Sequence, residues 1–176
     1  MSDSQPPPKD SFEERLSQVY IHHQNGRHAE AESIYRELIA EQPEIWQLHF
    51  NLGLLFFEQL RYEEALTCYL DGLAINEDCF DLLYNTAICQ KELERFEDAI
   101  TSYTKALSLE PEDIDCRYNL AGCYLSAGKD QESITAYTEL LDCQPVHIPS
   151  LNNLAYLFHK SGNSTNARDL YQRILK

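Results

Sequence analysis

Apolar residues recur along the chain with the three- and four-residue spacing of helices. In the segment 62–75 the apolar or small side chains that share one helical face are Ala65, Leu66, Tyr69, Leu70 and Leu73. The segment 46–58 is also mostly apolar, and it is too long and too weakly alternating for a strand. Pairs of such segments, separated by short breaks, continue along the chain. The pattern predicts an all-α protein built from helix pairs.

The chain contains an internal repeat of 34 residues. A tyrosine recurs at this interval, at Tyr35, Tyr69, Tyr103, Tyr137 and Tyr171. Four residues before each tyrosine stands a small side chain: Ala31, Ala65, Ala99, Ser133 and Ala167. Sixteen residues before each stands a second set: Val19, Gly53, Ala87, Ala121 and Ala155. Registers that recur together at a fixed period indicate a repeat solenoid.

The residue types in these registers suit helices that pack closely. Small side chains allow the two helices of a repeat to approach, and the large tyrosine packs against the neighbouring repeat. A single pair of short helices would leave one apolar face exposed, so stacking is needed. We expect an α-α superhelix of about five helix-turn-helix repeats, with a concave and a convex face. The breaks between paired helices contain Gly26, Gly128 and Gly162, which suit left-handed helix caps.

The expected domain covers 12–176 and follows a disordered, proline-rich tail at 1–11. Its repeats span about 12–45, 46–79, 80–113, 114–147 and 148–176, the last one incomplete. The runs N-L-G-L-L-F-F…Y-E-E-A…Y at 51–69 and N-L-A-G-C-Y…G…Y at 119–137 carry a family resemblance, as does 153–171. They resemble the tetratricopeptide repeat family, whose period is 34 residues. The first repeat departs from the pattern at Gln18-Val19, so its first helix is expected to act as an N-terminal cap.

Eighteen residues before each tyrosine, from the second repeat onward, stands an asparagine: Asn51, Asn85, Asn119 and Asn153. Asparagine is a mediocre helix former, so its recurrence at one register needs a reason. We expect this register on the concave edge, where an amide offers a donor and an acceptor to an extended peptide. The resemblance supports this, because a similar asparagine ladder holds substrate in the repeat arm of O-linked N-acetylglucosamine transferase. The alternative is that each asparagine ties neighbouring first helices together, and both roles can coexist.

Aromatic residues accompany the asparagines and are expected to form an apolar floor for peptide side chains. The predicted binding residues are therefore the four asparagines together with Phe50, Tyr84, Tyr118 and Tyr156. The alternative for each aromatic is partial burial against the next helix. Basic residues near this surface are few, namely Lys91, Arg117 and Lys160, so we do not expect the family's clamp for a terminal carboxylate.

Composition narrows the classes of partner and location. The formal net charge of −15 argues against nucleic acid and anionic membranes, which require a basic surface. No apolar run is long enough to span a bilayer, and no secretory signal stands at the start. The six cysteines form no C-x-x-C pair, which favours reduced thiols and a cytoplasmic location. No metal site, cofactor motif or catalytic constellation is predicted.

Two functions remain open from the sequence. The first is a non-enzymatic scaffold that binds an extended segment of a partner protein in its concave groove. The second is an N-terminal arm of a larger glycosyltransferase or methyltransferase, with a catalytic domain beyond Lys176. The last helix would also leave Leu170, Ile174 and Leu175 without full cover, with Tyr171 sharing the loss. We therefore expect either a longer protein or self-association, such as a homodimer, through the uncapped C-terminal repeat.

Overall fold

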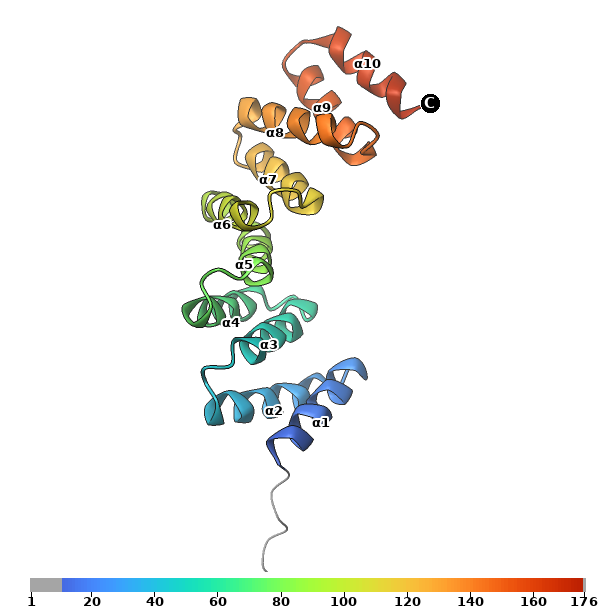
Figure 1. Cartoon of the computed structure of the whole chain (residues 1–176). Coiled ribbons are helices and arrows are strands. Elements are labelled where there is room, and N and C mark those ends of the chain that lie inside the picture. The colour runs from blue at the N-terminus through green and yellow to red at the C-terminus, as the bar shows by residue number, and fades with distance from the viewer. Residues whose placement is uncertain (1–10, 176) are drawn as a thin grey trace, which may run out of the picture. The chain divides into compact units, whose positions relative to one another are not determined.

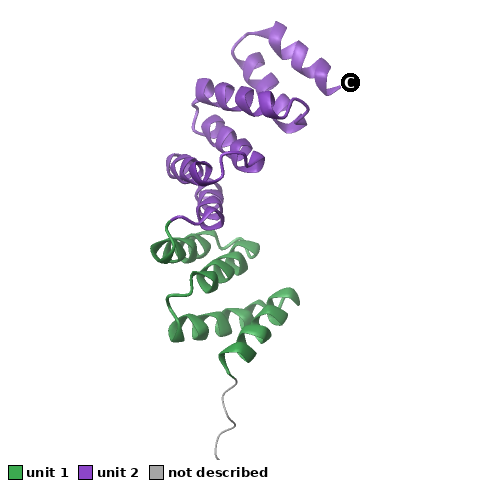
Figure 2. Cartoon of the chain, in the orientation of Figure 1, with its two compact units in different colours: residues 1–77 green, residues 78–176 purple. Residues whose placement is uncertain are grey.

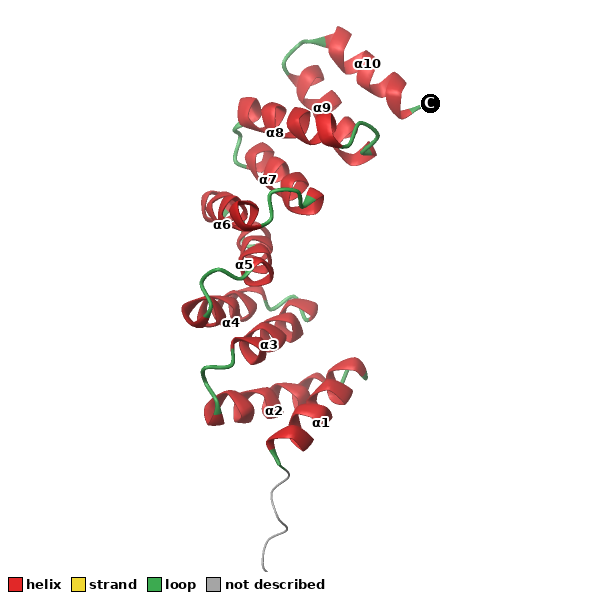
Figure 3. Ribbon diagram, viewed as in Figure 1, coloured by secondary structure: helices red, strands yellow, loops and turns green. Residues whose placement is uncertain are grey.

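The computed structural model describes residues 11–175, and this part of the chain consists of helices joined by short loops (Figures 1 and 3). The helices are α1 (Phe12–Gln24), α2 (His28–Glu41), α3 (Trp46–Glu58), α4 (Tyr62–Ile75), α5 (Phe80–Glu92), α6 (Phe96–Leu109), α7 (Ile114–Ser126), α8 (Asp130–Cys143), α9 (Ile148–Lys160) and α10 (Ser164–Ile174). The all-α prediction is confirmed. Of the proline-rich tail expected at 1–11, only Ser11 lies within the described residues.

The chain divides into two compact units (Figure 2). Unit 1 covers residues 1–77 and contains α1 to α4, and unit 2 covers residues 78–176 and contains α5 to α10. Within each unit, every helix packs on the helix that follows it in the sequence. None of the helices in the described range has the length and hydropathy that a membrane span requires.

The core of each unit is built from the repeating registers. Tyr35, Tyr69, Tyr103 and Tyr137 are all buried. Each tyrosine lies in the second helix of its pair, and the small residue four positions earlier is buried beside it. Gly53 shows how close this packing is, because a Cβ atom added there would lie 2.5 Å from the Tyr69 ring. The helix pairs therefore depend on small side chains at these registers.

The turn inside each pair passes through a residue with positive φ. Gly26, Gly128 and Gly162 occupy this position in three repeats, as the sequence predicts, and Leu60 and Glu94 occupy it in the other two with φ of 60° and 59°. The next backbone N–H reaches back to the carbonyl five residues earlier, as from Arg61 to Phe56 at 2.9 Å. This bond closes the left-handed helix cap in the non-glycine turns as well.

In the fifth repeat, one prediction from the sequence was wrong in part. Leu170 was expected to lose cover at the end of the chain, but it is only 7% exposed and packs in the same core cluster as Leu154 and Leu157 of α9. Its side chain faces its own helix pair and needs no following repeat. Of the other residues expected to lose cover, Tyr171 is 41% exposed and Leu175 is 86% exposed. Ile174 is half-buried and packs against the same core cluster, so the expectation was wrong for this residue as well.

Candidate peptide-binding surface

The asparagine register lines surface cavities in both units. Asn51 of α3 lines two cavities in unit 1, of about 740 Å³ and about 340 Å³. Asn119 of α7 and Asn153 of α9 line one cavity of about 460 Å³ in unit 2. Cavities of this size accommodate small ligands or several side chains. The same register thus borders accessible space in each unit.

In unit 2, two of the asparagines tie neighbouring first helices together. The Nδ2 of Asn119 donates to the Tyr84 hydroxyl on α5 at 2.9 Å. The Nδ2 of Asn153 donates to the Tyr118 hydroxyl on α7 at 3.3 Å and to the Tyr137 hydroxyl at 2.8 Å. This is the structural alternative that the sequence left open. The amide oxygens of both asparagines and the phenolic protons of Tyr84 and Tyr118 remain available to a ligand.

The other two asparagines are held differently. The Nδ2 of Asn85 donates to the backbone carbonyl of Asp81, four residues earlier on the same helix, at 2.8 Å. Asn51 makes no side-chain hydrogen bond with any described residue. The residue 35 positions before Asn51 is Leu16, which has no hydroxyl to receive its amide. The asparagine register therefore contains three side-chain amides that are hydrogen-bonded within the described residues and one, that of Asn51, that is not.

The four predicted aromatic residues also fall into two groups, which differ in how far their rings are buried. Phe50, Tyr84 and Tyr118 each pack against the buried tyrosine of their own repeat, with ring centroids 5.8, 5.8 and 5.9 Å apart. Their rings are half-buried, so the alternative of partial burial holds for these three. Tyr156 on α9 is 51% exposed and presents most of its ring to solvent. Among the four, Tyr156 is the best placed for direct contact with a ligand.

Two family models described as tetratricopeptide repeat match the chain, over residues 16–78 and 90–154. The chain belongs to the tetratricopeptide repeat family. The resemblance stated from the sequence is thereby confirmed. No curated protein matches the chain.

Solved tetratricopeptide repeat structures share the fold of the chain. MamA 41-end from Desulfovibrio magneticus RS-1 superposes with a TM-score of 0.87 at 15% identity, covering 94% of both chains. YrrB has a TM-score of 0.80 at 15% identity, covering 93% of this chain and 90% of its own. PilF from Pseudomonas aeruginosa has a TM-score of 0.74 at 20% identity, covering 93% and 75%. At these identities the likeness establishes the helical repeat solenoid and nothing finer.

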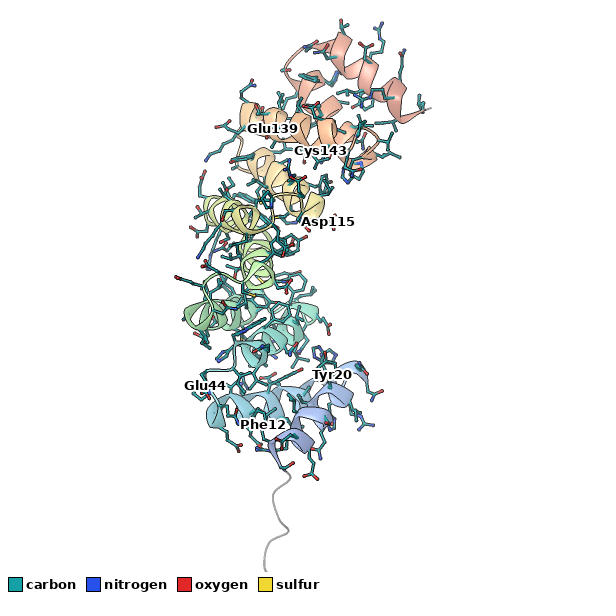
Figure 4. All side chains as sticks on the ribbon, in the orientation of Figure 1. Phe12, Tyr20, Glu44, Asp115, Glu139 and Cys143 are labelled. Atoms are coloured by element: carbon teal, nitrogen blue, oxygen red, sulfur yellow. The ribbon has the colours of Figure 1, made fainter. Side chains whose placement is uncertain are left out.

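Charges around the repeat surface of unit 2 are mainly acidic. Asp115 on α7 (labelled in Figure 4) is exposed and lies close enough to Tyr84 to raise the pKa of that phenol, after burial as the larger cause. The basic residues predicted near this surface have carboxylate neighbours. Lys91 lies 3.3 Å from Glu92, and Lys160 lies 2.7 Å from Asp130. A ligand carboxylate would therefore compete with an existing carboxylate partner at either lysine.

The sequence missed part of the surface in unit 1. Phe12, Ile45 and Leu48 line the larger cavity beside Asn51, together with Leu16 and Tyr20. The sequence does carry a signal for this cavity, namely the type of residue that stands 35 positions before each asparagine. That residue is a tyrosine for Asn119 and Asn153 and a leucine for Asn51. A leucine at this register leaves both space and an unpaired amide.

Proposed function

We propose that the chain is a protein-interaction module that binds extended segments of partner proteins along its first helices, without catalysing a reaction. The observation that carries this proposal is that the asparagine register lines a surface cavity in each unit. The family membership supports it, because repeat solenoids present extended binding surfaces. A further support is YrrB, which shares the fold and is described as a TPR protein with an unusual peptide-binding site.

The chemistry of the surface suits the backbone of an extended peptide. Such a backbone presents both N–H donors and carbonyl acceptors along its edges. The amide oxygens of Asn119 and Asn153 would accept peptide N–H groups, and the hydroxyls of Tyr84 and Tyr118 would donate to peptide carbonyls. Each neutral hydrogen bond of this kind contributes about 0.5–1.5 kcal/mol net. Contact with exposed Tyr156 would add apolar surface burial.

A selection experiment tests the proposal. Random dodecapeptides displayed on phage are selected on the immobilised 176-residue chain, and the enriched peptides are synthesised with a fluorescent label. Fluorescence anisotropy should give affinities that fall about 5- to 150-fold when the two amides proposed to bind the peptide backbone are removed, as in Asn119→Ala with Asn153→Ala. Glu139→Ala, an exposed change on the second helix α8, is the matched control. If no peptide is enriched, or if only the α8 variant weakens binding, the proposal is wrong.

The C-terminal repeat carries a separate prediction of self-association. Tyr171 and Leu175 are exposed at the end of the chain, whereas the tyrosines at the same register as Tyr171 in the other four repeats are buried. Exposed stacking residues favour association with another apolar surface. Light scattering over a range of concentrations should show the 176-residue chain associating, and Leu175→Glu should shift it toward monomer. A mass equal to the monomer at every concentration would contradict the prediction.

The remaining expectations stay predictions. These are the absence of a nucleic-acid partner, the cytoplasmic location and the alternative of an N-terminal arm that precedes a transferase domain.

A further inference from the structure

One groove of unit 1 combines two chemically different compartments. The cavities of about 740 Å³ and about 340 Å³ share Tyr20 and Asn51, so they adjoin between α1 and α3. The larger compartment is lined mainly by apolar side chains, among them Phe12, Leu16 and Leu48. The smaller one is lined by polar side chains that include Glu58. Figure 4 labels Phe12 and Tyr20 along α1, at this groove.

The apolar compartment exists because of a local change in the repeat. In unit 2 the tyrosine hydroxyl of one first helix receives the asparagine amide of the next, as in Tyr84 with Asn119. In unit 1 the position that corresponds to Tyr84 is Leu16, and the position that corresponds to the asparagine of the later repeats is Ser17. Both side chains are shorter than those they replace. The space between α1 and α3 therefore stays open, and the Asn51 amide keeps its donors and acceptor for a ligand.

The polar compartment has an acidic group with no Lys or Arg partner among the described residues. The Glu58 carboxylate is 56% exposed, and its partner is the ring of His23, with Nε2 at 3.2 Å. Three arginines of unit 1 are engaged elsewhere: Arg15 with Glu41, Arg36 with Glu32, and Arg61 with Glu32 and Glu64. A cationic side chain on a ligand would complement Glu58.

We propose that this groove is the site that selects the partner sequence, and that it takes an extended peptide carrying one apolar and one basic side chain. The apolar side chain occupies the compartment beside Leu16 and Leu48. The peptide backbone hydrogen-bonds to the Asn51 amide, and a lysine or arginine of the peptide faces Glu58. The inference rests on the proposed function, since it specifies the peptide that the module binds. Asn51 thereby has a ligand-binding role that the hydrogen-bonded Asn119 and Asn153 share only in part.

The test begins with displayed random heptapeptides selected on the full chain. We expect enriched sequences to place a large apolar residue and a lysine or arginine at a constant spacing. One enriched peptide is then titrated by fluorescence anisotropy against Leu16→Glu, Asn51→Ala and Glu58→Lys. Leu16 and Glu58 are partly exposed, so these changes spare the core. Each variant should bind about 10-fold or more weakly, while Glu139→Lys, an exposed change on the second helix α8 of unit 2, should bind like the wild-type chain.

A charge exchange separates direct contact from misfolding. A peptide whose basic residue is replaced by glutamate should bind Glu58→Lys better than it binds the wild-type chain. The inference is overturned if enriched peptides lack the apolar and basic pair, or if the three unit 1 variants bind the enriched peptide as tightly as the wild-type chain does. In both cases peptides are still bound, so the proposed function stands. If no heptapeptide or dodecapeptide is enriched, the proposed function fails as well.

Discussion

The side-chain amide of Asn119 donates a hydrogen bond of 2.9 Å to the hydroxyl of Tyr84, a residue 35 positions earlier in the chain. Asn153 makes the same kind of bond to Tyr118, again across 35 positions. In both cases the bond connects one first helix to the next. At Asn119 and Asn153 the recurring asparagine is therefore a tie between first helices as well as a surface amide.

This bond predicts coupling between the two side chains. Tyr84→Phe and Asn119→Ala should each lower the free energy of unfolding by about 0.5–1.5 kcal/mol, because each removes one partner of a half-buried hydrogen bond. The double variant should lose less than the sum of the two, with a coupling energy of about 0.5 kcal/mol or more. Urea denaturation of the four proteins measures the cycle. Tyr156→Phe, an exposed hydroxyl, is the control, and strictly additive losses would contradict the tie.

The contact between Gly53 and Tyr69 predicts opposite effects at two helical glycines. Gly53→Ala would place a Cβ 2.5 Å from the Tyr69 ring and should destabilise the protein by about 1–3 kcal/mol. Gly122→Ala would place its Cβ 3.6 Å from the Tyr137 hydroxyl, an ordinary contact. That change should stabilise the protein by up to about 1 kcal/mol through helix propensity. Thermal melts monitored by circular dichroism measure both changes. Equal shifts of the melting temperature in the two variants would contradict a close contact between Gly53 and Tyr69.

The left-handed turns predict another pair of opposite effects. Glu94 has a φ of 59°, which is strained for a residue with a Cβ, so Glu94→Gly should raise the free energy of unfolding by about 0.5–1 kcal/mol. Gly128 has a φ of 74°, and no atom lies within 4 Å of the position that a Cβ would take there. Gly128→Ala should therefore cost about 1 kcal/mol through backbone strain alone. Denaturant midpoints measure both changes, and a stabilising Gly128→Ala would contradict the turn geometry.

The buried thiols predict a loss of stability at alkaline pH. Burial raises the pKa of Cys68, Cys89 and Cys116 to about 12 and that of Cys123 to about 11, from an ordinary value of 9.0. Since these pKa values are raised in the folded state, deprotonation increasingly favours the unfolded chain as the pH approaches and then exceeds about 9. The free energy of unfolding should fall between pH 7.5 and 9.5, by less than about 1 kcal/mol for each thiol.

Alkylation provides the matching measurement on the same cysteines. In the native protein at pH 8, iodoacetamide should modify exposed Cys143 first, and the buried thiols should react only in denaturant. Mass spectrometry counts the modified sites. Rapid native labelling of Cys89 or Cys123 would show that these thiols are not enclosed in the helix pairs.

The amino-acid sequence by itself determined the helix pairs, their 34-residue period and the buried tyrosines. These features depend on local spacing: Ala65 and Tyr69 share a helical face because they are four residues apart, whatever the rest of the chain does. The burial of Ala31 or Tyr103 follows once neighbouring repeats stack. The sequence also placed the asparagine register on an accessible surface, but it left open what each amide binds.

Only the tertiary structure decided which amides are paired. The partner of Asn119 is a hydroxyl on a different helix. The leucine 35 positions before Asn51 becomes meaningful only because α1 and α3 border the same cavity. The burial of Leu170 was also a tertiary outcome, because it depends on the direction of a side chain within its own helix pair. The spacing of residues along a helix determines which face of the helix each side chain lies on. The hydrogen-bond partner and the burial of that side chain depend on which residues of the neighbouring helix pack against it.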